Sequence, residues 1–336
     1  MSTVKHEGSK VYIVGVRRIA WDTGEMCEFA SALIAALGAL GESITYPYVM
    51  GTSGAAFRFT LNPGAWDFGN YGIRNISMDP NEPIRRAFAA TGYHYTLFER
   101  KRYDTAYGKP LSFGDAQDRQ GTRSVDLTRI TASIDRGVPV LAFGVVGPSD
   151  CCVIAGYDDA GEVLLGWSTY QDIPDDHNIP HDPTGYFRKP NWHESLDGYI
   201  VIGEKAGPPS MRAINLDALW WAVKLEGTPK VGTRCAGLAG LTMWANEMTQ
   251  EAWFPPDGLQ VLGDRYVSTT INMTMLDDHH SAEPFLRQMA QEEPDLAAGL
   301  LQAAESYADA CRLRNRLDEH IREDFSAEAM RGIGQP

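Results

Sequence analysis

The sequence is poor in basic residues. Lysine and arginine together number 30 against 44 acidic residues, which gives a formal charge of −14 at pH 7. A field of this sign repels polyanions and anionic membrane surfaces. We therefore expect neither nucleic acid nor a membrane as a partner.

Long apolar runs and a disulfide framework are also lacking. No N-terminal stretch has the length of a signal-peptide core, and no later segment approaches the roughly 20 apolar residues that cross a bilayer. The cysteines are odd in number, and adjacent cysteines seldom bridge because disulfide geometry is restrictive. These features predict a cytoplasmic protein with reduced thiols. The five cysteines are Cys27, Cys151, Cys152, Cys235 and Cys311.

What is present indicates a globular chain in two parts. Apolar residues make up 43% and charged residues 22%, which excludes wholesale disorder. The segment GPPS at 207–210 is typical of a linker. Strands and helices alternate before it, and helical periodicity dominates after it. We predict one unit over residues 1–206 and a helical domain or lid over 211–330 that packs on the first, with Trp220, Trp221 and Trp244 buried by that packing.

The apolar patterns predict an antiparallel meander in the first part. Runs at 138–146, 152–157 and 163–167 are separated by GPSD and by DDAGE, which is a strong turn signal. Residues 104–122 are polar and predict an exposed loop. The remaining expected elements are strands at 11–16, 93–98 and 198–203, and helices at 24–40, 83–90, 127–136, 216–225, 238–248, 273–290 and 295–323.

Cys27 is the one credible nucleophile. It lies at the start of the Ala-rich helix expected at 24–40, where unpaired backbone N–H groups and the helix dipole favour a thiolate. Glu25 and Glu28 oppose this, because nearby carboxylates raise a thiol pKa. The alternative is that Cys27 is a small buried residue of an apolar helix. As a nucleophile, it should be the most reactive of the five thiols.

Four segments together carry a resemblance to a known family. The order and spacing of these segments resemble the papain-like fold, and more closely the bacterial group that contains the bacteriocin-processing peptidases and the N-terminal domain of the butirosin-biosynthesis acyltransferase. The helical remainder, including GLAGLTMWANEM, resembles a C-terminal extension that accompanies this domain in uncharacterised bacterial proteins. The segments are GEMCEFASALIAALG (24–38), GVPVLAFGVVG (137–147), CCVIAGYDDAGEVLLGWS (151–168) and GYFRKPNWHESLDGYIVIGEK (185–205).

The resemblance implies an α+β, papain-like fold with an antiparallel sheet and a central N-terminal helix, followed by an all-α C-terminal region. It puts Cys27 at the position of the nucleophile. The general-base histidine of the family would stand six residues before Gly156, where this chain has Asp150. The base-orienting residue would fall near Gly166 or Trp167. The residues expected to line the cleft are Glu25, Asp150, Cys152, Trp167, Tyr186 and Arg188. The alternative for Tyr186 and Arg188 is that they anchor the last strand by packing and by a surface ion pair.

Three explanations of the missing histidine remain open. The fold is retained without hydrolysis and binds a small ligand or an acyl chain. A histidine from another segment completes the site. Cys27 works with a carboxylate such as Asp150 or Glu25, or with no base, on an activated thioester, because thiol and thioester exchange has a low intrinsic barrier. The candidate histidines are His177, His181, His193, His279 and His280.

Metal and cofactor sites are not expected. The segments DDHNIPHD (175–182) and DDHH (277–280) are rich in possible ligands. Prolines disfavour a helix in the first segment, and successive positions on a helix point in different directions in the second.

Together with the resemblance, Cys27 predicts a cysteine-dependent acyltransferase or amide-bond enzyme acting on a small-molecule or carrier-protein-bound acyl substrate. The alternative is a catalytically inactive papain-like binding module, and a homo-oligomer is left open.

Overall fold

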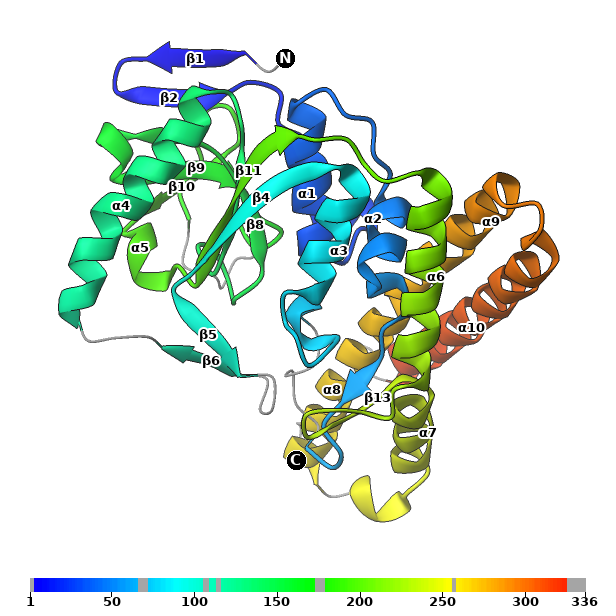
Figure 1. Ribbon diagram of the computed structural model, residues 1–336. Coiled ribbons are helices and arrows are strands. Elements are labelled where there is room, and N and C mark those ends of the chain that lie inside the picture. Colours follow the sequence, from blue (N-terminus) through cyan, green and yellow to red (C-terminus); the bar gives the residue numbers. More distant parts are fainter. Residues whose placement is uncertain are drawn as a thin grey trace.

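A computed structural model describes residues 3–65, 72–104, 109–112, 116–172, 179–255 and 258–324. Its architecture is α+β, with antiparallel sheets in the first part and a helical C-terminal region (Figure 1). This confirms the coarse fold class that the sequence predicts.

The main sheet has eight strands, and every pairing in it is antiparallel. Its order is β1-β2-β8-β7-β11-β4, and β9 and β10 continue from β8. The consecutive pairs β7 with β8 and β8 with β9 form the predicted meander. The strands are β1 (Val4–Glu7), β2 (Lys10–Ile13), β4 (Tyr93–Glu99), β7 (Val140–Phe143), β8 (Cys151–Asp158), β9 (Val163–Trp167), β10 (Phe187–Pro190) and β11 (Gly198–Lys205).

The sheet lies between two helices, α4 (Ala116–Asp135) and α1 (Glu28–Ala39) (Figure 1). Helix α1 packs on β8 and β7, and every residue from Glu28 to Leu37 is buried. A run of Ala, Leu and Phe without a polar face explains this, because such a helix has apolar side chains to bury on all sides. The central helix is therefore enclosed, and its N-terminal end lies inside the protein.

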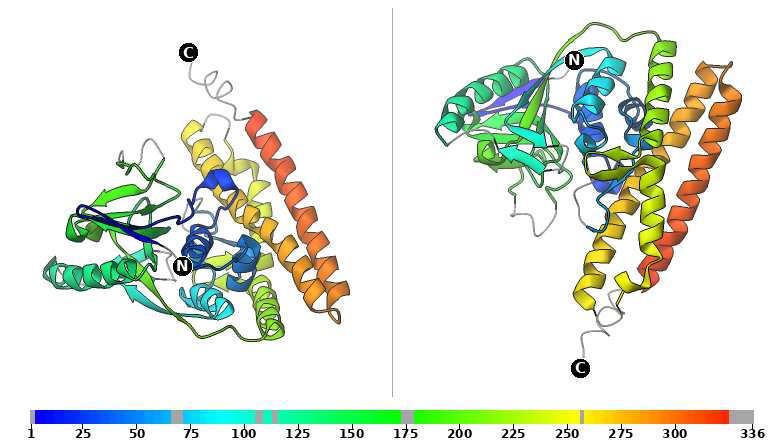
Figure 2. Two further views of the ribbon diagram at one scale, coloured as in Figure 1. Left: turned by 90° about the horizontal axis from the view of Figure 1, so that it is seen from above. Right: turned by 60° about the horizontal axis from the view of Figure 1, so that its bottom comes forward.

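Further helices form successive layers beyond α1. Helix α2 (Tyr46–Ser53) packs beside it, α3 (Glu82–Thr91) packs on α2, and α6 and α9 of the C-terminal region also pack on α2 (Figure 2). The side chain of Trp221 fastens this outer layer, because its Nε1 donates a hydrogen bond to the backbone oxygen of Ser53 at 3.1 Å. The C-terminal helices are α6 (Met211–Gly227), α7 (Gly237–Met248), α8 (Leu259–Asp278), α9 (Ala282–Glu292) and α10 (Ala297–Asp324).

The remaining elements are short. A three-stranded sheet has the order β12-β13-β3, and β5 pairs with β6. A four-residue helix, α5 (Trp192–Ser195), precedes β11. The short strands are β3 (Thr60–Leu61), β5 (Lys101–Asp104), β6 (Lys109–Ser112), β12 (Lys230–Val231) and β13 (Arg234–Ala236).

Several expectations need correction. The C-terminal region is not all-α, because β12 and β13 lie within it and β13 pairs with β3 of the first part. The expected loop at 104–122 instead contains β6 and the first turns of α4. Trp221 and Trp244 are buried as expected, but Trp220 is 55% exposed. No helix in the described ranges combines the length and the apolar character that a membrane span needs.

Candidate functional site

Cys27 stands immediately before α1, at its N-cap position, with an extended backbone. Its carbonyl oxygen accepts a hydrogen bond from the Ser31 N–H at 3.1 Å. Its own N–H donates to the Tyr46 hydroxyl at 2.8 Å. The sequence predicts a helix from residue 24, whereas the helix begins at Glu28 and residues 21–23 form a separate short turn, η1 (Trp21–Thr23). The cysteine is thus fixed at a helix start, as the nucleophile interpretation requires.

The Cys27 thiol is protonated at neutral pH. Burial raises its pKa to about 12, with further raising contributions from Asp278 and Glu28 and an opposing one from Arg58. The side chain is only 2% exposed. Burial therefore outweighs the thiolate stabilisation that a helix start provides.

A small cavity adjoins the thiol. Its volume is about 10 Å³, enough for roughly one water molecule. No histidine is found among the described residues that line it. Those residues are Cys27, Glu28, Phe29, Gly72, Ile73, Arg74, Phe143, Ser149, Asp150 and Cys151.

Two carboxyl groups line this cavity, that of the buried Glu28 and that of the partly buried Asp150. Burial raises the pKa of Glu28 well above its ordinary value, and the charge of Asp150 raises it further. Burial also raises the pKa of Asp150, against the hydrogen bond that the Tyr170 hydroxyl donates to its Oδ2 at 2.8 Å. The Trp21 Nε1 donates to Glu28 Oε1 at 3.2 Å. The charge of Asp150 disfavours ionisation of Glu28, so the pair tends to retain a proton.

A buried ion pair from distant parts of the chain acts on the same thiol. The Arg58 Nε donates to Asp278 Oδ2 at 2.8 Å, and the two side chains are 3% and 0% exposed. Burial lowers the pKa of His279 to about 4. Its imidazole is therefore neutral at pH 7, and its Nε2 lies 3.0 Å from the Arg58 carbonyl oxygen, to which the Nε2–H tautomer donates. The helical region thus contributes directly to the electrostatics at Cys27.

Of the residues that the sequence singled out, Cys27 and Asp150 meet in the cavity. Cys152 does not line it: successive strand residues point to opposite faces, so Cys151 faces the cavity while the Cys152 thiol donates to the Ala142 oxygen at 3.3 Å. Glu25 forms an ion pair with Arg17 instead.

Trp167, Tyr186 and Arg188 lie together at another place. The Trp167 Nε1 donates to the Val16 oxygen at 2.9 Å, and the Tyr186 hydroxyl donates to the Ile13 oxygen at 2.7 Å. The two rings contact each other edge to face, with centroids 5.0 Å apart. These contacts hold β9 and β10 to the chain that leads from β2 toward Cys27.

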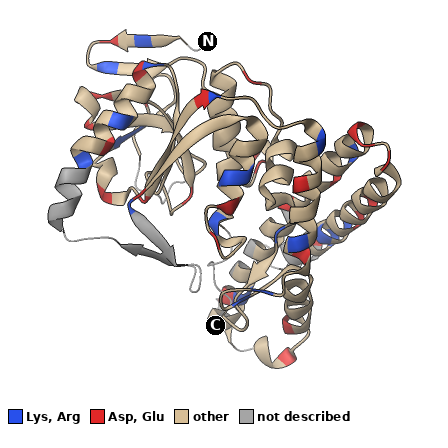
Figure 3. Ribbon diagram, viewed as in Figure 1, with Lys and Arg blue, Asp and Glu red and all other residues tan. Residues whose placement is uncertain are grey.

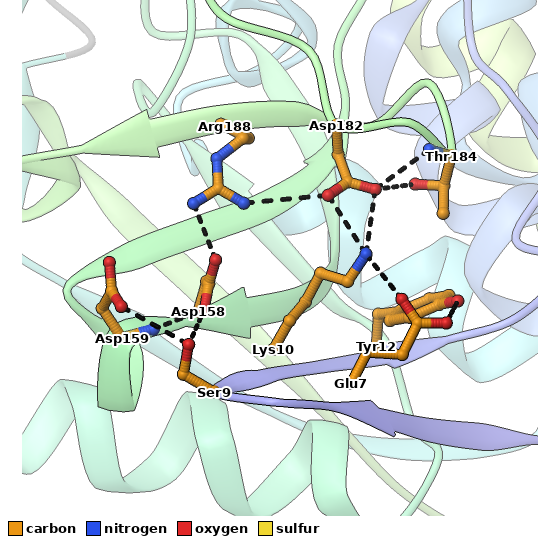
Figure 4. Close-up of polar contacts among 9 residues, drawn as sticks. All are labelled: Glu7, Ser9, Lys10, Tyr12, Asp158, Asp159, Asp182, Thr184 and Arg188. Carbon is orange, nitrogen blue, oxygen red and sulfur yellow. Dashed lines mark hydrogen bonds and ion pairs between the residues drawn. The ribbon is translucent and has the colours of Figure 1, made fainter.

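Arg188 belongs to an ionic network beside these rings (Figure 4). It pairs with Asp158 at 2.7 Å and with Asp182 at 3.7 Å. Asp182 also pairs with Lys10 at 3.2 Å, and Lys10 pairs with Glu7 at 3.0 Å. The network fastens the β1–β2 hairpin to β8 and β10, so Arg188 has partners that account for its position without a ligand.

The candidate histidines do not converge on the cavity. His181 is exposed, 3.6 Å from Asp172, and the His193 ring contacts Trp192. His279 is held at the Arg58 carbonyl, His280 is exposed, and His177 lies outside the described residues. Across the described ranges, no three His, Cys, Asp or Glu side chains are grouped so as to hold a metal ion.

The sequence did not reveal Tyr46, Arg58, Arg74, Ser149 or Asp278 as neighbours of the site. Ser149 lies in the turn segment GPSD and Asp278 in DDHH, but neither segment indicates a place beside Cys27, and only the folded chain brings these residues together. Comparison with known proteins finds no family model and no curated protein that matches the chain.

Proposed function

We propose that residues 1–206 adopt a papain-like fold and that the protein is a cysteine-dependent acyltransferase acting on a small-molecule or carrier-bound thioester. The observation that carries this proposal is that Cys27 and Asp150 line one cavity. Cys27 heads the central helix, and Asp150 immediately precedes β8, where papain-like enzymes have the general-base histidine. A carboxyl group of raised pKa thus occupies the place of the imidazole.

The chemistry follows from these two groups. Asp150 acts as the ionised member of the Glu28 and Asp150 pair, and its carboxylate accepts the Cys27 proton as Sγ attacks the thioester carbonyl carbon. N–H groups at the start of α1 stabilise the oxyanion that forms. The C–S bond of the donor then breaks, the donor thiolate takes the proton back from the pair, and the acyl group remains on Cys27. An amine or alcohol acceptor later attacks the acyl-cysteine and releases the thiol.

A thioester suits this site better than a peptide. A thiol with a pKa of about 12 needs help from a base at the moment of attack, and a carboxylate is a weak base for it. A thioester has a good leaving group, whereas an amine must be protonated before it leaves.

A second candidate is a catalytically inactive binding module. The raised pKa of Cys27 and a cavity of about 10 Å³ favour it, because both are typical of a structural cysteine. Acyl loading of the cysteine separates the two candidates.

The test is intact-protein mass spectrometry after incubation with acyl thioesters of N-acetylcysteamine. We expect one acyl adduct, mapped by peptide analysis to Cys27 and absent in Cys27→Ala. Asp150→Asn keeps an acceptor for Tyr170 but removes the base, so the loading rate should fall by roughly 10²-fold, the low end for general-base catalysis. Cys151→Ala is the matched control, because Cys151 lines the same cavity.

The proposal fails if no adduct forms on the folded protein, if the adduct maps to another cysteine, or if Asp150→Asn loads as fast as the unaltered chain. Circular dichroism of each variant verifies that the fold is retained. Absence of any adduct in all folded forms would favour the binding module.

A further inference from the structure

A second, larger cavity lies away from Cys27, where the N-terminal side of α3, the C-terminal end of α6 and β12 meet. Its volume is about 350 Å³, within the range of small-molecule sites. In Figure 1 this is the region at the lower end of α6, near β13. The floor is apolar and buried, and consists of Ile76, Trp221, Leu225 and Val231.

The rim of this cavity carries charges of both signs, and acidic and basic positions lie close together on α3 and α6 (Figure 3). Its two carboxylates already have partners, because Asp79 and Glu82 both pair with Arg85 and Glu82 also pairs with Arg86. Its two lysines have no such ionic partner, and Lys224 contacts the rings of Trp220 and Trp221. Within the described part of the chain, neither Lys224 nor Lys230 has a carboxylate oxygen within 4.0 Å. The charge left uncompensated at this rim is therefore positive, in a chain whose formal charge is −14.

The floor and one of the cations are already in position. The Trp221 ring is fixed by the hydrogen bond of its Nε1 to Ser53. The Lys224 Nζ lies 5.4 Å from the centre of that ring. A ligand that fills the cavity would contact an apolar floor and a nearby ammonium group with little rearrangement, and preorganisation of this kind favours affinity.

We propose that this cavity binds a small organic anion, with its apolar body on Trp221 and its negative group at Lys224 and Lys230. The proposal is independent of the chemistry at Cys27. Residues 72–74 line the Cys27 cavity and residues 76–79 line this one, but the two cavities share no lining residue. A carboxylate or a sulfonate on an aromatic or branched aliphatic body fits the stated volume and charge.

The test compares three probes that share one apolar body and differ in charge. They are 2-naphthoate, 2-naphthalenemethanol and 2-naphthylmethylammonium, each titrated into the full chain by isothermal calorimetry. Naphthoate should bind most tightly and the ammonium probe most weakly. In the double variant Lys224→Gln/Lys230→Gln, naphthoate should lose about 10-fold in affinity, as expected when a charge-assisted contact is lost, and should bind like the alcohol.

The matched control is Lys5→Gln/Lys189→Gln, which changes the net charge by the same amount at strands β1 and β10. It should bind naphthoate as the unaltered chain does. Equal affinity for the three probes, an equal loss in both double variants, or no detectable binding at millimolar naphthoate would overturn the proposal. Both double variants change side chains at the surface, so an unaltered melting temperature is expected and shows that the comparison is made on folded protein.

Discussion

Removing Asp278 should be among the most destabilising single changes in the helical region. Its partner Arg58 is 3% exposed, and the carboxylate itself is 0% exposed. Asp278→Ala removes the counter-charge that this carboxylate supplies to a buried guanidinium, which costs about 3–5 kcal/mol of unfolding free energy. An exposed pair is worth about 0–1 kcal/mol. The Arg17 and Glu25 pair, with side chains 42% and 15% exposed, provides the comparison.

Urea unfolding followed by circular dichroism measures these differences in unfolding free energy. They are obtained from the shift in the urea concentration at the unfolding midpoint, provided that the dependence of free energy on urea keeps the same slope. Glu25→Ala should cost at most about 1 kcal/mol. The double variant Arg58→Met/Asp278→Leu should cost less than Asp278→Ala alone, because it removes both charges and fills the space with apolar side chains. Two results would show that Arg58 and Asp278 do not form a coupled buried contact. The first is that Asp278→Ala costs no more stability than Glu25→Ala. The second is that the double variant costs as much as the single variants Arg58→Met and Asp278→Leu added together.

Two further changes test the site and the interface between the layers. The raised pKa of Glu28 means that the folded protein keeps a proton that the unfolded chain has lost, so stability falls as pH rises through the folded pKa. Glu28→Gln should therefore raise the melting temperature more at about pH 8 than at about pH 5, and an equal effect at both pH values would contradict the raised pKa. At Gly54, with φ +90°, an added Cβ would lie 2.3 Å from the Trp221 Nε1. Gly54→Ala should cost clearly more stability than Gly41→Ala, because at Gly41 φ is similar, at +91°, but no atom lies within 4 Å of the added Cβ. Equal losses in the two variants would show that the backbone strain, and not the contact with Trp221, determines the cost.

The parts of the fold that the sequence predicts are those with local causes. The turn between β8 and β9 is such a part. Asp159, Ala160 and Gly161 all adopt positive φ there, and the segment DDAGE is typical of a turn of this kind. Strands β1 and β10 escaped prediction for the opposite reason. Strand β1 is largely exposed, and β10 ends in Pro190, so neither has an apolar alternation to recognise.

The residues of the candidate site also divide into those that the sequence could identify and those that it could not. Cys27 could be identified from a helix start, and Asp150 from the position that the resemblance gives to the family's histidine before Gly156. The pairing of Arg58 with Asp278 could not be predicted, because the two residues are 220 positions apart and the segment DDHH around Asp278 does not indicate a partner. The consequence is chemical, because the groups that raise and lower the Cys27 pKa include this pair. Sequence reasoning could therefore locate the thiol but not its protonation state.

The proposed boundary near residue 206 is a boundary of sequence pattern, and contacts of three kinds cross it. Strand β13 pairs with β3, Arg58 forms a buried ion pair with Asp278, and Trp221 is hydrogen-bonded to Ser53. Each contact satisfies polar groups that are buried or that lie at a strand edge. The helices after residue 211 cannot then act as a freely swinging lid, because opening them would break all three kinds of contact together. Access of a substrate to Cys27 would instead require movement of the residues that line its cavity, which include Gly72, Ile73 and Arg74.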